Sequence, residues 1–583
     1  MRAALTFALA CGLAAPALNV LHVIVDDLRP DLGCYGREWA QTPHFNTLAR
    51  HGFVFTQAHA AIANCAPSRA SFMLGRRPDW TGVVDLNTHF RDRDPRAVTL
   101  PQALRESAHR YLTVSYGKVF HQRQDDAASW SPQSEFADNH TCRGARGECH
   151  QPASAWDYWQ YMVPSRRDGG NVFERLFERG PDDNPRGLGY TDHVIADQAR
   201  AALARLAAQP RPWYVAVGFV RPHLPFNAPS AFFDAIVPWL VPPPPCVAAA
   251  RSWSRLSRRS VFEGLTELTA NFHAQNIGGL LSDHATGALT KRGRVLAAAY
   301  HAAVSFVDAQ FGRVIQRLHE TSMAPSTVIV MHGDHGFKLG HFGSWGKHSL
   351  MTQDTHVPLI VSVPRADGRR AGARAAGRVD RPVGLLDVYP TLLELAGVAP
   401  DYATLHGRSL RPALRAARAP DDERADAAAV AISQWPFGLD YNEETPCMGY
   451  AVRVANWTLL QWVLTPVRCT KHECSGPLRG TAEDRAAWSA LRTRGFGAHR
   501  GVPNPCLGQA ELFHTPATYG DTPSVEPDGV NVLDYYPRVT ERLRALLAKH
   551  AGLDPASLGL RNSLEDEAGG TALKIPGRRR HRP

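Results

Sequence analysis

The chain lacks the features that mark membrane proteins, repeat proteins and zinc proteins. After residue 17, no stretch approaches the ~20 consecutive apolar residues that a membrane span needs. There is no internal repeat, and no Cys-x-x-Cys pair occurs among the ten cysteines. Charged residues are 21% and hydrophobic residues 44% of the 583 residues, as in ordinary soluble globular proteins. We therefore expect no membrane span, and a large buried core shared between one big domain and a smaller one.

The first 17 residues have the pattern of a secretory signal peptide. Arg2 precedes an apolar stretch from Ala3 to Ala10, and Ala15-Pro16-Ala17 supplies the small residues of a cleavage site. The alternative is the first helix of a cytosolic protein, but so short an apolar run has little other use at a terminus. We predict a signal peptide over residues 1–17 and a place in the secretory pathway, either lysosomal or extracellular.

The cysteines fit an oxidising compartment. Cys11 lies in the predicted signal peptide and Cys65 in a motif described below, which leaves eight of the ten for disulfides. Two pairs are close enough in sequence to close small loops, Cys142 with Cys149 and Cys469 with Cys474. Zinc binding is the alternative use of these cysteines. A glycoprotein is also expected, because two triplets are N-glycosylation sequons, Asn139-His140-Thr141 and Asn456-Trp457-Thr458.

The formal net charge of +10 is concentrated at one end of the chain. Five of the positive charges lie in the last ten residues: Lys574, Arg578, Arg579, Arg580 and Arg582. A basic terminal run is usually a solvated tail, and it can also hold an anionic polysaccharide or a cell surface. We therefore predict no nucleic-acid partner and a basic, disordered tail over residues 551–583.

Strand-like apolar runs alternate with helical stripes, which is the pattern of an α/β protein. Trp213–Phe219 is expected to be a buried strand, and the helix before it has one apolar face made of Ile195, Ala199, Ala202 and Leu206. A second stripe leads into the apolar run 328–331, and it consists of Tyr300, Val304, Val307, Phe311, Val314 and Leu318. We predict a large, mainly parallel central sheet flanked by helices, with ligands at the carboxyl ends of its strands.

Changes in composition predict the domain boundaries. The large domain should span residues 18–410 and contain a surface insertion at about 238–295, which includes Pro242–Pro245 and a basic stretch. An Ala/Arg/Asp-rich linker is expected at 411–430. Beyond it, segments such as Tyr450-Ala451-Val452 and Trp457–Leu460 predict a smaller α+β subdomain over residues 431–550.

Two acidic clusters come directly after predicted strands. Asp26-Asp27 follows Val20–Val25, and Asp334-His335 follows the apolar run 328–331. An Asp-Asp pair after a strand is often only a helix cap or a solvated loop. Strands that converge at these ends would instead build one site, and carboxylate oxygens suit Ca²⁺ or Mg²⁺. The two clusters together therefore predict a metal site.

A single cysteine begins the segment Cys65-Ala66-Pro67-Ser68-Arg69. Cysteine is a competent nucleophile, so one interpretation is a thiol enzyme that uses His121 or His223 as its base. That interpretation gives no use to Pro67 and Arg69 at fixed offsets from the cysteine.

These motifs together resemble the sulfatases of the alkaline phosphatase superfamily, in which the cysteine of a Cys-x-Pro-x-Arg signal is oxidised to Cα-formylglycine before folding. Further blocks between about residues 19 and 410 are similar to the iduronate-2-sulfatase branch: Asn64–Phe72, Gly75–Asp79, Gly117–His121, Arg221–Phe226 and His356–Leu359. A weaker likeness continues at 448–450 and 511–513. The resemblance implies an alkaline phosphatase-like sheet and a C-terminal subdomain with an antiparallel sheet.

The resemblance also implies a role for each candidate site residue. Cys65, converted by a formylglycine-generating enzyme, would hydrate to a geminal diol, with one oxygen to attack sulfur and another to expel sulfate. The metal would be Ca²⁺ rather than Mg²⁺, with five ligand residues: Asp26, Asp27, Cys65, Asp334 and His335. His335 would either ligate or hydrogen-bond the site. The residues around the sulfate would be Arg69, Lys118, His121, His223 and Lys347, and either His121 or His223 would protonate the leaving group.

The predicted activity is sulfuric ester hydrolysis, and the implied substrate is a 2-O-sulfated uronate in a glycosaminoglycan-like polysaccharide. The alternatives are a phosphate or phosphonate ester hydrolase on the same scaffold, and a catalytically silent polysaccharide-binding protein. Gly340-His341-Phe342-Gly343 stands where relatives often have Gly-Glu-His-Gly, and Asp79 and Leu86–Thr88 match the substrate-facing region only approximately. In relatives, residues of this loop contact the ligand, so the departures affect the choice of sugar.

Overall fold

The computed structural model describes residues 17–121, 124–132, 177–179, 186, 190–239, 241, 281, 288–364, 374–416, 429–437, 447–464, 468–469, 474–475, 509–514, 531–551, 553 and 558. Its largest element is an eight-stranded sheet with the order β12–β2–β10–β7–β1–β5–β3, and β11 is joined to β10. The strands are β1 (Asn19–Val25), β2 (Phe53–His59), β3 (Leu112–Gly117), β5 (Trp213–Phe219), β7 (Thr327–Gly333), β10 (His356–Pro364), β11 (Arg374–Ala375) and β12 (Gly377–Gly384).

The sheet is mainly parallel, which confirms the prediction. β10 runs antiparallel to its neighbours β2 and β7, and the other pairs along the strand order are parallel. The central strands β1, β5 and β7 are buried along almost their whole length. Both faces of a parallel sheet are covered, so these strands are mostly apolar and do not alternate with exposed polar residues.

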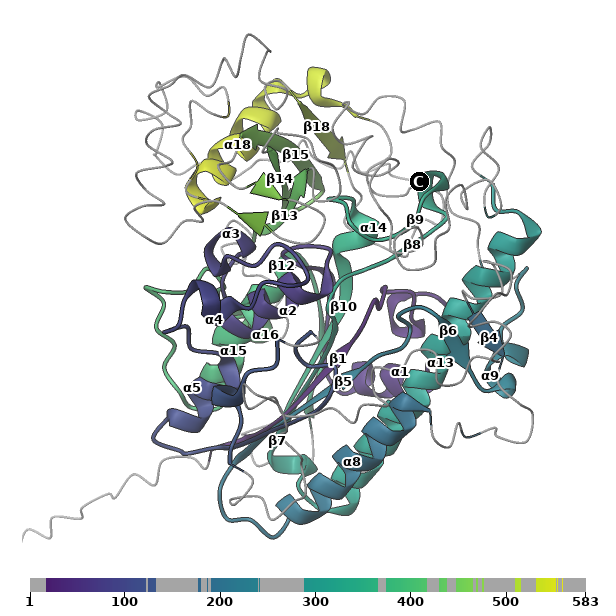
Figure 1. Ribbon diagram of the computed structural model, residues 1–583, viewed down its shortest axis with the longest axis vertical. Coiled ribbons are helices and arrows are strands. Elements are labelled where there is room, and N and C mark those ends of the chain that lie inside the picture. Colours follow the sequence, from purple (N-terminus) through teal and green to yellow (C-terminus); the bar gives the residue numbers. More distant parts are fainter. Residues whose placement is uncertain are drawn as a thin grey trace, which may run out of the picture.

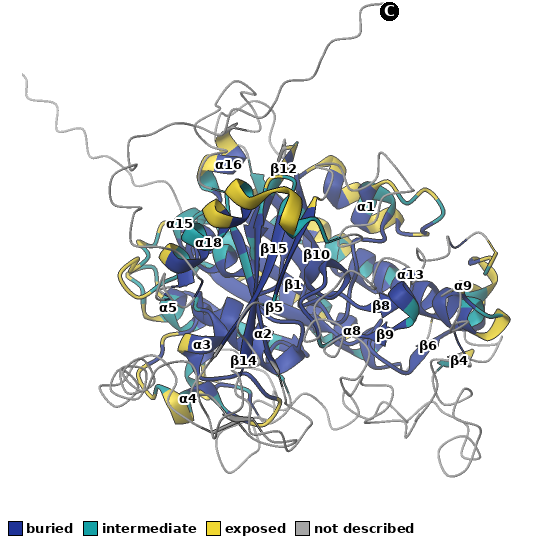
Figure 2. Cartoon of the chain, turned by 90° about the horizontal axis from the view of Figure 1, so that it is seen from above, coloured by how far each residue is buried: buried dark blue, intermediate teal, exposed yellow. Residues whose placement is uncertain are grey.

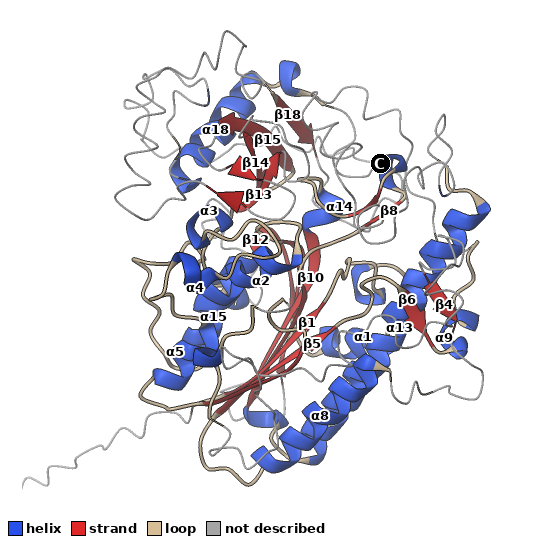
Figure 3. Cartoon of the chain, viewed as in Figure 1, coloured by secondary structure: helices blue, strands red, loops and turns tan. Residues whose placement is uncertain are grey.

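Helices cover both faces of this sheet (Figures 1 and 3). In β1, Leu21 and Val23 pack into one apolar cluster while Val20 and Ile24 pack into another, because successive side chains point to opposite faces. α1 (Pro43–Arg50), α8 (Thr191–Leu206) and α13 (Lys291–Glu320) lie on one side, and α2 (Cys65–Leu74), α5 (Leu100–Glu106) and α15 (Val388–Leu395) on the other. Figure 2 shows the strands buried between these two layers.

Both predicted helical stripes are confirmed. α8 buries Ile195, Ala199, Ala202 and Leu206, and α13 buries all six residues of the second stripe. The first turn of α13 is capped by Thr290, whose side-chain oxygen accepts the N–H of Gly293 at 3.1 Å. Both helices contribute to one core cluster, and α13 leads into β7 as expected.

The smaller subdomain is an antiparallel sheet with one helix packed on it. Its strand order is β13 (Ala431–Phe437), β14 (Cys447–Val454), β15 (Trp457–Leu464) and β18 (Ala510–His514), and α18 (Pro537–Ala551) covers it. The opposite face packs Trp435 and Trp462 against Ile62 of the large domain. Ser433 and Gln434 of β13 donate hydrogen bonds of 2.7 Å to the carbonyls of Ala60 and Ala61. The subdomain therefore holds the loop that precedes Cys65.

The other described elements are short: η1 (Gly33–Tyr35), α3 (Pro78–Thr81), α4 (Phe90–Arg93), η2 (Ala127–Ser129), β4 (Phe177–Arg179), β6 (Phe226–Ala228), α9 (Ser230–Asp234), η6 (Ala324–Ser326), β8 (Lys338–Leu339), η7 (His341–Gly343), β9 (Trp345–Gly346), α14 (Thr352–Thr355), η8 (Leu385–Asp387), α16 (Arg411–Ala416), β16 (Arg468–Cys469), β17 (Cys474–Ser475) and η10 (Leu533–Tyr535).

Several predicted segments lie outside the described residues: residues 1–16 of the signal peptide, most of the 238–295 insertion, residues 417–428 of the linker and nearly all of the basic tail. α16 occupies the start of the predicted linker. Cys34 is a free thiol, so it does not serve as one of the eight predicted disulfide cysteines. Within the described part of the chain, no helix is long and apolar enough to span a membrane.

Candidate active site

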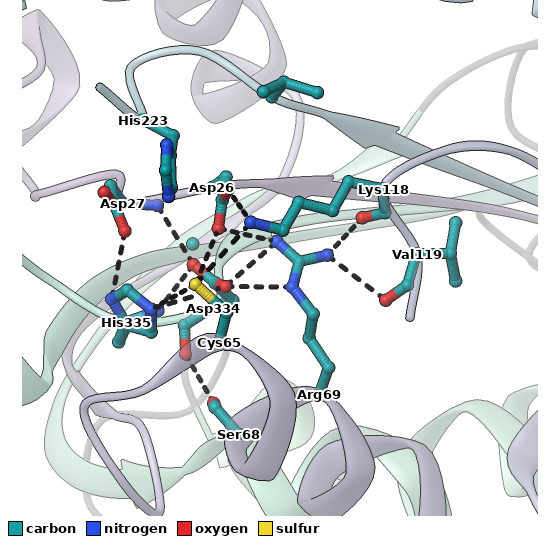
Figure 4. Close-up of polar contacts among 12 residues, drawn as sticks. Asp26, Asp27, Cys65, Ser68, Arg69, Lys118, Val119, His223, Asp334 and His335 are labelled. Atoms are coloured by element: carbon teal, nitrogen blue, oxygen red, sulfur yellow. Dashed lines mark hydrogen bonds and ion pairs between the residues drawn. The ribbon is translucent and has the colours of Figure 1, made fainter. Parts of the chain in front are cut away.

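Most of the predicted site residues meet at one edge of the large sheet, as Figure 4 shows. Parallel strands end at the same edge, so residues far apart in sequence become neighbours there. The segments that supply them are the ends of four strands and the start of one helix: Asp26 and Asp27 after β1, Lys118 after β3, His223 after β5, Asp334 and His335 after β7, and Cys65 at the first position of α2. All of these side chains are buried.

Cys65 lies at the centre of the cluster. Its Sγ is 3.2 Å from Lys347 Nζ and 3.3 Å from His335 Nε2. Asp26 Oδ1 lies 3.5 Å from the same sulfur and Lys118 Nζ lies 3.6 Å from it. The amino terminus of a helix favours negative charge, so an oxyanion formed at residue 65 would gain from both the lysines and the helix.

The thiol form of Cys65 is a poor nucleophile in this position. Burial raises the pKa of the Cys65 thiol well above its ordinary value, and the carboxylate of Asp26 raises it further. Lys118 and Lys347 oppose this rise without overcoming it. Because the thiolate is the reactive form, the geometry disfavours a thiol enzyme.

Arg69 joins three segments of the site. Its Nη2 donates to Asp26 Oδ1 at 3.0 Å and its Nε to Asp334 Oδ2 at 3.0 Å. Its Nη1 donates to the carbonyls of Val119, at 3.2 Å, and Lys118. The guanidinium is fully buried and therefore ties α2 to β1, β7 and the end of β3.

Asp26 stays ionised despite its burial. Desolvation alone would raise its pKa, but the cations Lys118 and Arg69 hold the pKa of this carboxyl well below its usual range. Lys118 donates directly to Asp26 Oδ2, and His223 and Lys347 act in the same direction. Asp26 is thus a permanent anion next to Cys65.

The position of Lys118 depends on two glycines. Gly117 has φ of 73°, and a Cβ added to it would lie 2.1 Å from the carbonyl oxygen of Gly218. A Cβ added to Gly218 would lie 2.0 Å from the carbonyl oxygen of Lys118. Side chains would separate the ends of β3 and β5, so this close approach needs glycine at both positions.

Asp27 and His335 form the other side of the cluster. Asp27 has φ of 59°, and Asp334 Oδ1 holds this left-handed backbone by accepting the N–H of Asp27 at 3.0 Å. The hydroxyl of Tyr300 donates to the Asp27 carbonyl at 2.7 Å. Lys347 Nζ donates to Asp27 Oδ1 at 2.7 Å, and His335 Nδ1 lies 3.4 Å from the same oxygen. An uncommon conformation secured at three sites is typical of a functional position.

The donor atoms have the spacing and chemistry of a cation site. One ligand atom from each of Asp26, Asp27, Cys65 and His335 lies within 4.8 Å of all the others. Ligands at 2.3–2.6 Å from Ca²⁺ stand at most about 5 Å apart, so this group fits one ion. Asp334 lies beside the group: its Oδ1 accepts the N–H groups of Asp27 and His335, and its Oδ2 accepts from Arg69.

The two candidate proton donors differ in environment. Burial, together with the charge of Lys118, holds the pKa of His121 well below its ordinary value, so its ring is neutral. His223 lies beside Asp26 (Figure 4), and its Nδ1 is 2.7 Å from the carbonyl oxygen of Leu224. A carbonyl only accepts, so Nδ1 carries the proton in this contact, and a second proton on the ring would bind to Nε2.

Asp192 supports this loop, and the sequence interpretation missed it. Its two carboxylate oxygens accept the backbone N–H groups of Val220, at 2.6 Å, and Arg221, at 3.1 Å. Burial raises its pKa to about 6. In the sequence, an acidic residue in the first turn of a predicted helix indicates only a helix start, and the link to His223 requires the fold.

The two segments that depart from the family pattern are packed against other parts of the protein. His341 is buried, with Nε2 3.2 Å from Arg29 Nη2, and Phe342 belongs to the core cluster beneath the smaller subdomain. Asp79 pairs with Arg77 at 3.3 Å and accepts the hydroxyl of Tyr450 at 3.3 Å. These side chains connect separate parts of the fold.

Replacement of Arg69 by Gln should lower the free energy of unfolding of the metal-free protein by about 3–5 kcal/mol, because Asp26 and Asp334 lose a buried partner. Arg378→Gln is the matched control: this arginine is exposed, pairs with Asp380 at 2.7 Å, and should change stability by less than about 1 kcal/mol. Urea denaturation measures both variants. Equal stability losses in the two variants would contradict the bridging role of Arg69.

Comparisons with known proteins show the family to which the chain belongs. A family model described as Sulfatase matches residues 18–398. Human iduronate 2-sulfatase is 31% identical over 518 residues, which cover 77% of this chain and 85% of that protein.

Two solved structures illustrate the shared fold. The phosphonate monoester hydrolase of Agrobacterium radiobacter has a TM-score of 0.57 with 19% identity, over 91% of this chain and 96% of that one. A protein solved with its substrate D-glucosamine-2-N,6-O-disulfate has a TM-score of 0.58 with 18% identity, over 92% and 99%. The chain belongs to the sulfatase family and is an enzyme similar to iduronate 2-sulfatase.

Proposed function

We propose that this sulfatase uses Cys65, oxidised to Cα-formylglycine, as its nucleophile, and that it removes 2-O-sulfate from uronate residues of a glycosaminoglycan-like polysaccharide. The observation that carries the proposal is the set of contacts around Cys65 Sγ, where two lysines, a histidine and a carboxylate lie within 3.2–3.6 Å. A hydrated aldehyde at residue 65 would place its hydroxyls where that sulfur now lies.

The chain's own residues account for the steps of such a reaction. One hydroxyl of the hydrate attacks sulfur, and the bond between sulfur and the ester oxygen breaks. His223, which lies beside Asp26, protonates the leaving alcohol. Loss of a proton from the second hydroxyl then expels sulfate and restores the aldehyde. Lys118, Lys347 and Arg69 offset the negative charge on the sulfate oxygens.

We propose that Asp26, Asp27, His335 and the converted Cys65 hold Ca²⁺, with Asp334 a further predicted ligand. The donor set is mainly hard oxygen, which favours Ca²⁺ or Mg²⁺ over softer metals. When bound, the cation would lower the pKa of the attacking hydroxyl and polarise a sulfate oxygen. The low pKa of Asp26 would keep this ligand deprotonated in mildly acidic surroundings.

The substrate and the cellular setting are proposed from similarity. The relative with 31% identity is named iduronate 2-sulfatase, which supports a 2-O-sulfated uronate as the reacting sugar. Conversion of Cys65 requires a formylglycine-generating enzyme as a maturation partner, and the signal-like first 17 residues fit a lysosomal or extracellular glycoprotein with disulfides.

Turnover of an aryl sulfate and an aryl phosphate tests the reaction class. We expect faster hydrolysis of the sulfate, no turnover in Cys65→Ala, and a single sulfate transfer without further turnover in Cys65→Ser, because serine has no second hydroxyl to expel the sulfate. Thermal unfolding is the control, and Cys65→Ala should keep a near-native transition. Faster hydrolysis of the phosphate would favour a phosphate or phosphonate esterase. Absence of turnover with both esters would favour the catalytically silent polysaccharide-binding protein.

Removal of divalent cations should abolish aryl sulfate turnover, and added Ca²⁺ should restore it, because the cation activates the attacking hydroxyl. Asp27→Asn should weaken Ca²⁺ binding, measured directly by calorimetry, whereas Asp380→Asn at the exposed surface should leave it unchanged. Full turnover in a preparation verified as metal-free would contradict the cation site.

A further inference from the structure

A cavity lies away from Cys65, where the smaller subdomain meets the large domain. It has a volume of about 700 Å³ and is lined by the end of β12, η8, residues 402–410, the start of β13 and the end of α18. The backbone N–H groups of His406 and Gly407 bond to the carbonyl of Gly75, directly after α2. Cys65 begins that ten-residue helix, so the cavity is about 15 Å along its axis from the nucleophile.

Positive charge dominates the described lining of this cavity. Among the described residues of the lining, the permanently cationic side chains are Arg77, Arg381, Arg408 and Lys549, and the one carboxylate is Asp387. Arg77 is already paired with Asp79, which leaves Arg381, Arg408 and Lys549 as the main source of positive charge. The two oxygens of Asp387 accept the N–H groups of Gly384, at 3.0 Å, and Arg408, at 2.7 Å, so they face the backbone. The lining is therefore suited to an anion.

Burial, and then the nearby cations, lower the pKa of both histidines in the cavity. Burial, with the added charge of Arg77, lowers the pKa of His406 to about 3. Burial, with Arg408, Lys549 and Arg77, lowers the pKa of His550 to about 4. Arg408 Nη2 is 2.7 Å from His550 Nδ1, so this arginine contacts the neutral imidazole directly.

One exposed aromatic ring lines the cavity, and another lies against a lining residue. Tyr402, which lines the cavity, is 47% exposed, and Trp80 is 42% exposed. The ring centroids of Trp80 and His406 are 4.9 Å apart. The negative face of an aromatic ring attracts the C–H groups on the flat side of a sugar. Cations with exposed aromatics therefore fit a charged sugar better than a bare anion.

We propose that this cavity is a second carbohydrate-binding site, which takes a sulfated or carboxylated segment of a polysaccharide. The volume is within the range of sites that enclose ligands of several rings, and exceeds the need of one sulfate ion. The ligand class rests on the proposed function, but the site shares no residue with the cluster around Cys65. A polymer held here and at Cys65 would gain affinity from two linked contacts.

Calorimetry with a heparin-derived tetrasaccharide tests the site, using the Cys65→Ala protein so that no turnover occurs. We expect two binding events. The double variant Arg408→Gln/Lys549→Gln should weaken one of them at least about tenfold, since each charged hydrogen bond contributes substantially. The matched control is Arg538→Gln/Arg542→Gln, which removes the same charge from exposed positions of α18 outside the lining and should keep both events.

Two results would overturn the proposal: unchanged tetrasaccharide binding in Arg408→Gln/Lys549→Gln, or inorganic sulfate that binds the cavity as tightly as the tetrasaccharide. Aryl sulfate turnover, with Cys65 restored, should be the same in both double variants, because a small ester does not reach the cavity. If the protein without substitutions hydrolyses no aryl sulfate, that result counts against the proposed function alone. The tetrasaccharide measurement does not depend on turnover.

Discussion

The pairing of buried carboxylates with buried cations is the constraint on which the rest of this structure depends. Asp26 cannot be ionised in the interior without Arg69 and Lys118, and these cations cannot be buried without Asp26 and Asp334. These ion pairs fix α2 against the ends of β1, β3 and β7. Cys65 then lies with its sulfur beside two lysines, a histidine and a carboxylate.

The fold brings these charged residues together with only a few short motifs. A mainly parallel sheet brings the residue after each strand to one edge, so short motifs separated by hundreds of residues meet without long loops. The smaller subdomain contributes at a distance, because β13 holds the carbonyls of Ala60 and Ala61 just before Cys65. The same junction encloses the cationic cavity, so the architecture places both sites on the two ends of α2.

The sequence was sufficient for features that depend on local pattern. It predicted β5, the apolar faces of α8 and α13, and the clusters at Asp26, Cys65 and Asp334, because strand periodicity and short motifs are local. It could not predict that Asp192 holds the loop of His223, or that His341 and Asp79 are packed inside, because those roles depend on tertiary contacts. The cavity was equally inaccessible, since five separate segments form its wall.

The central claim is that residue 65 acts as an aldehyde. Mass spectrometry of the peptide containing Cys65, from protein isolated from its natural source, tests this most directly. The account predicts a peptide that is lighter than the cysteine form, because a CHO side chain replaces CH2SH. The peptide should also react with a hydrazine. An unmodified thiol at residue 65 in catalytically active protein would contradict it.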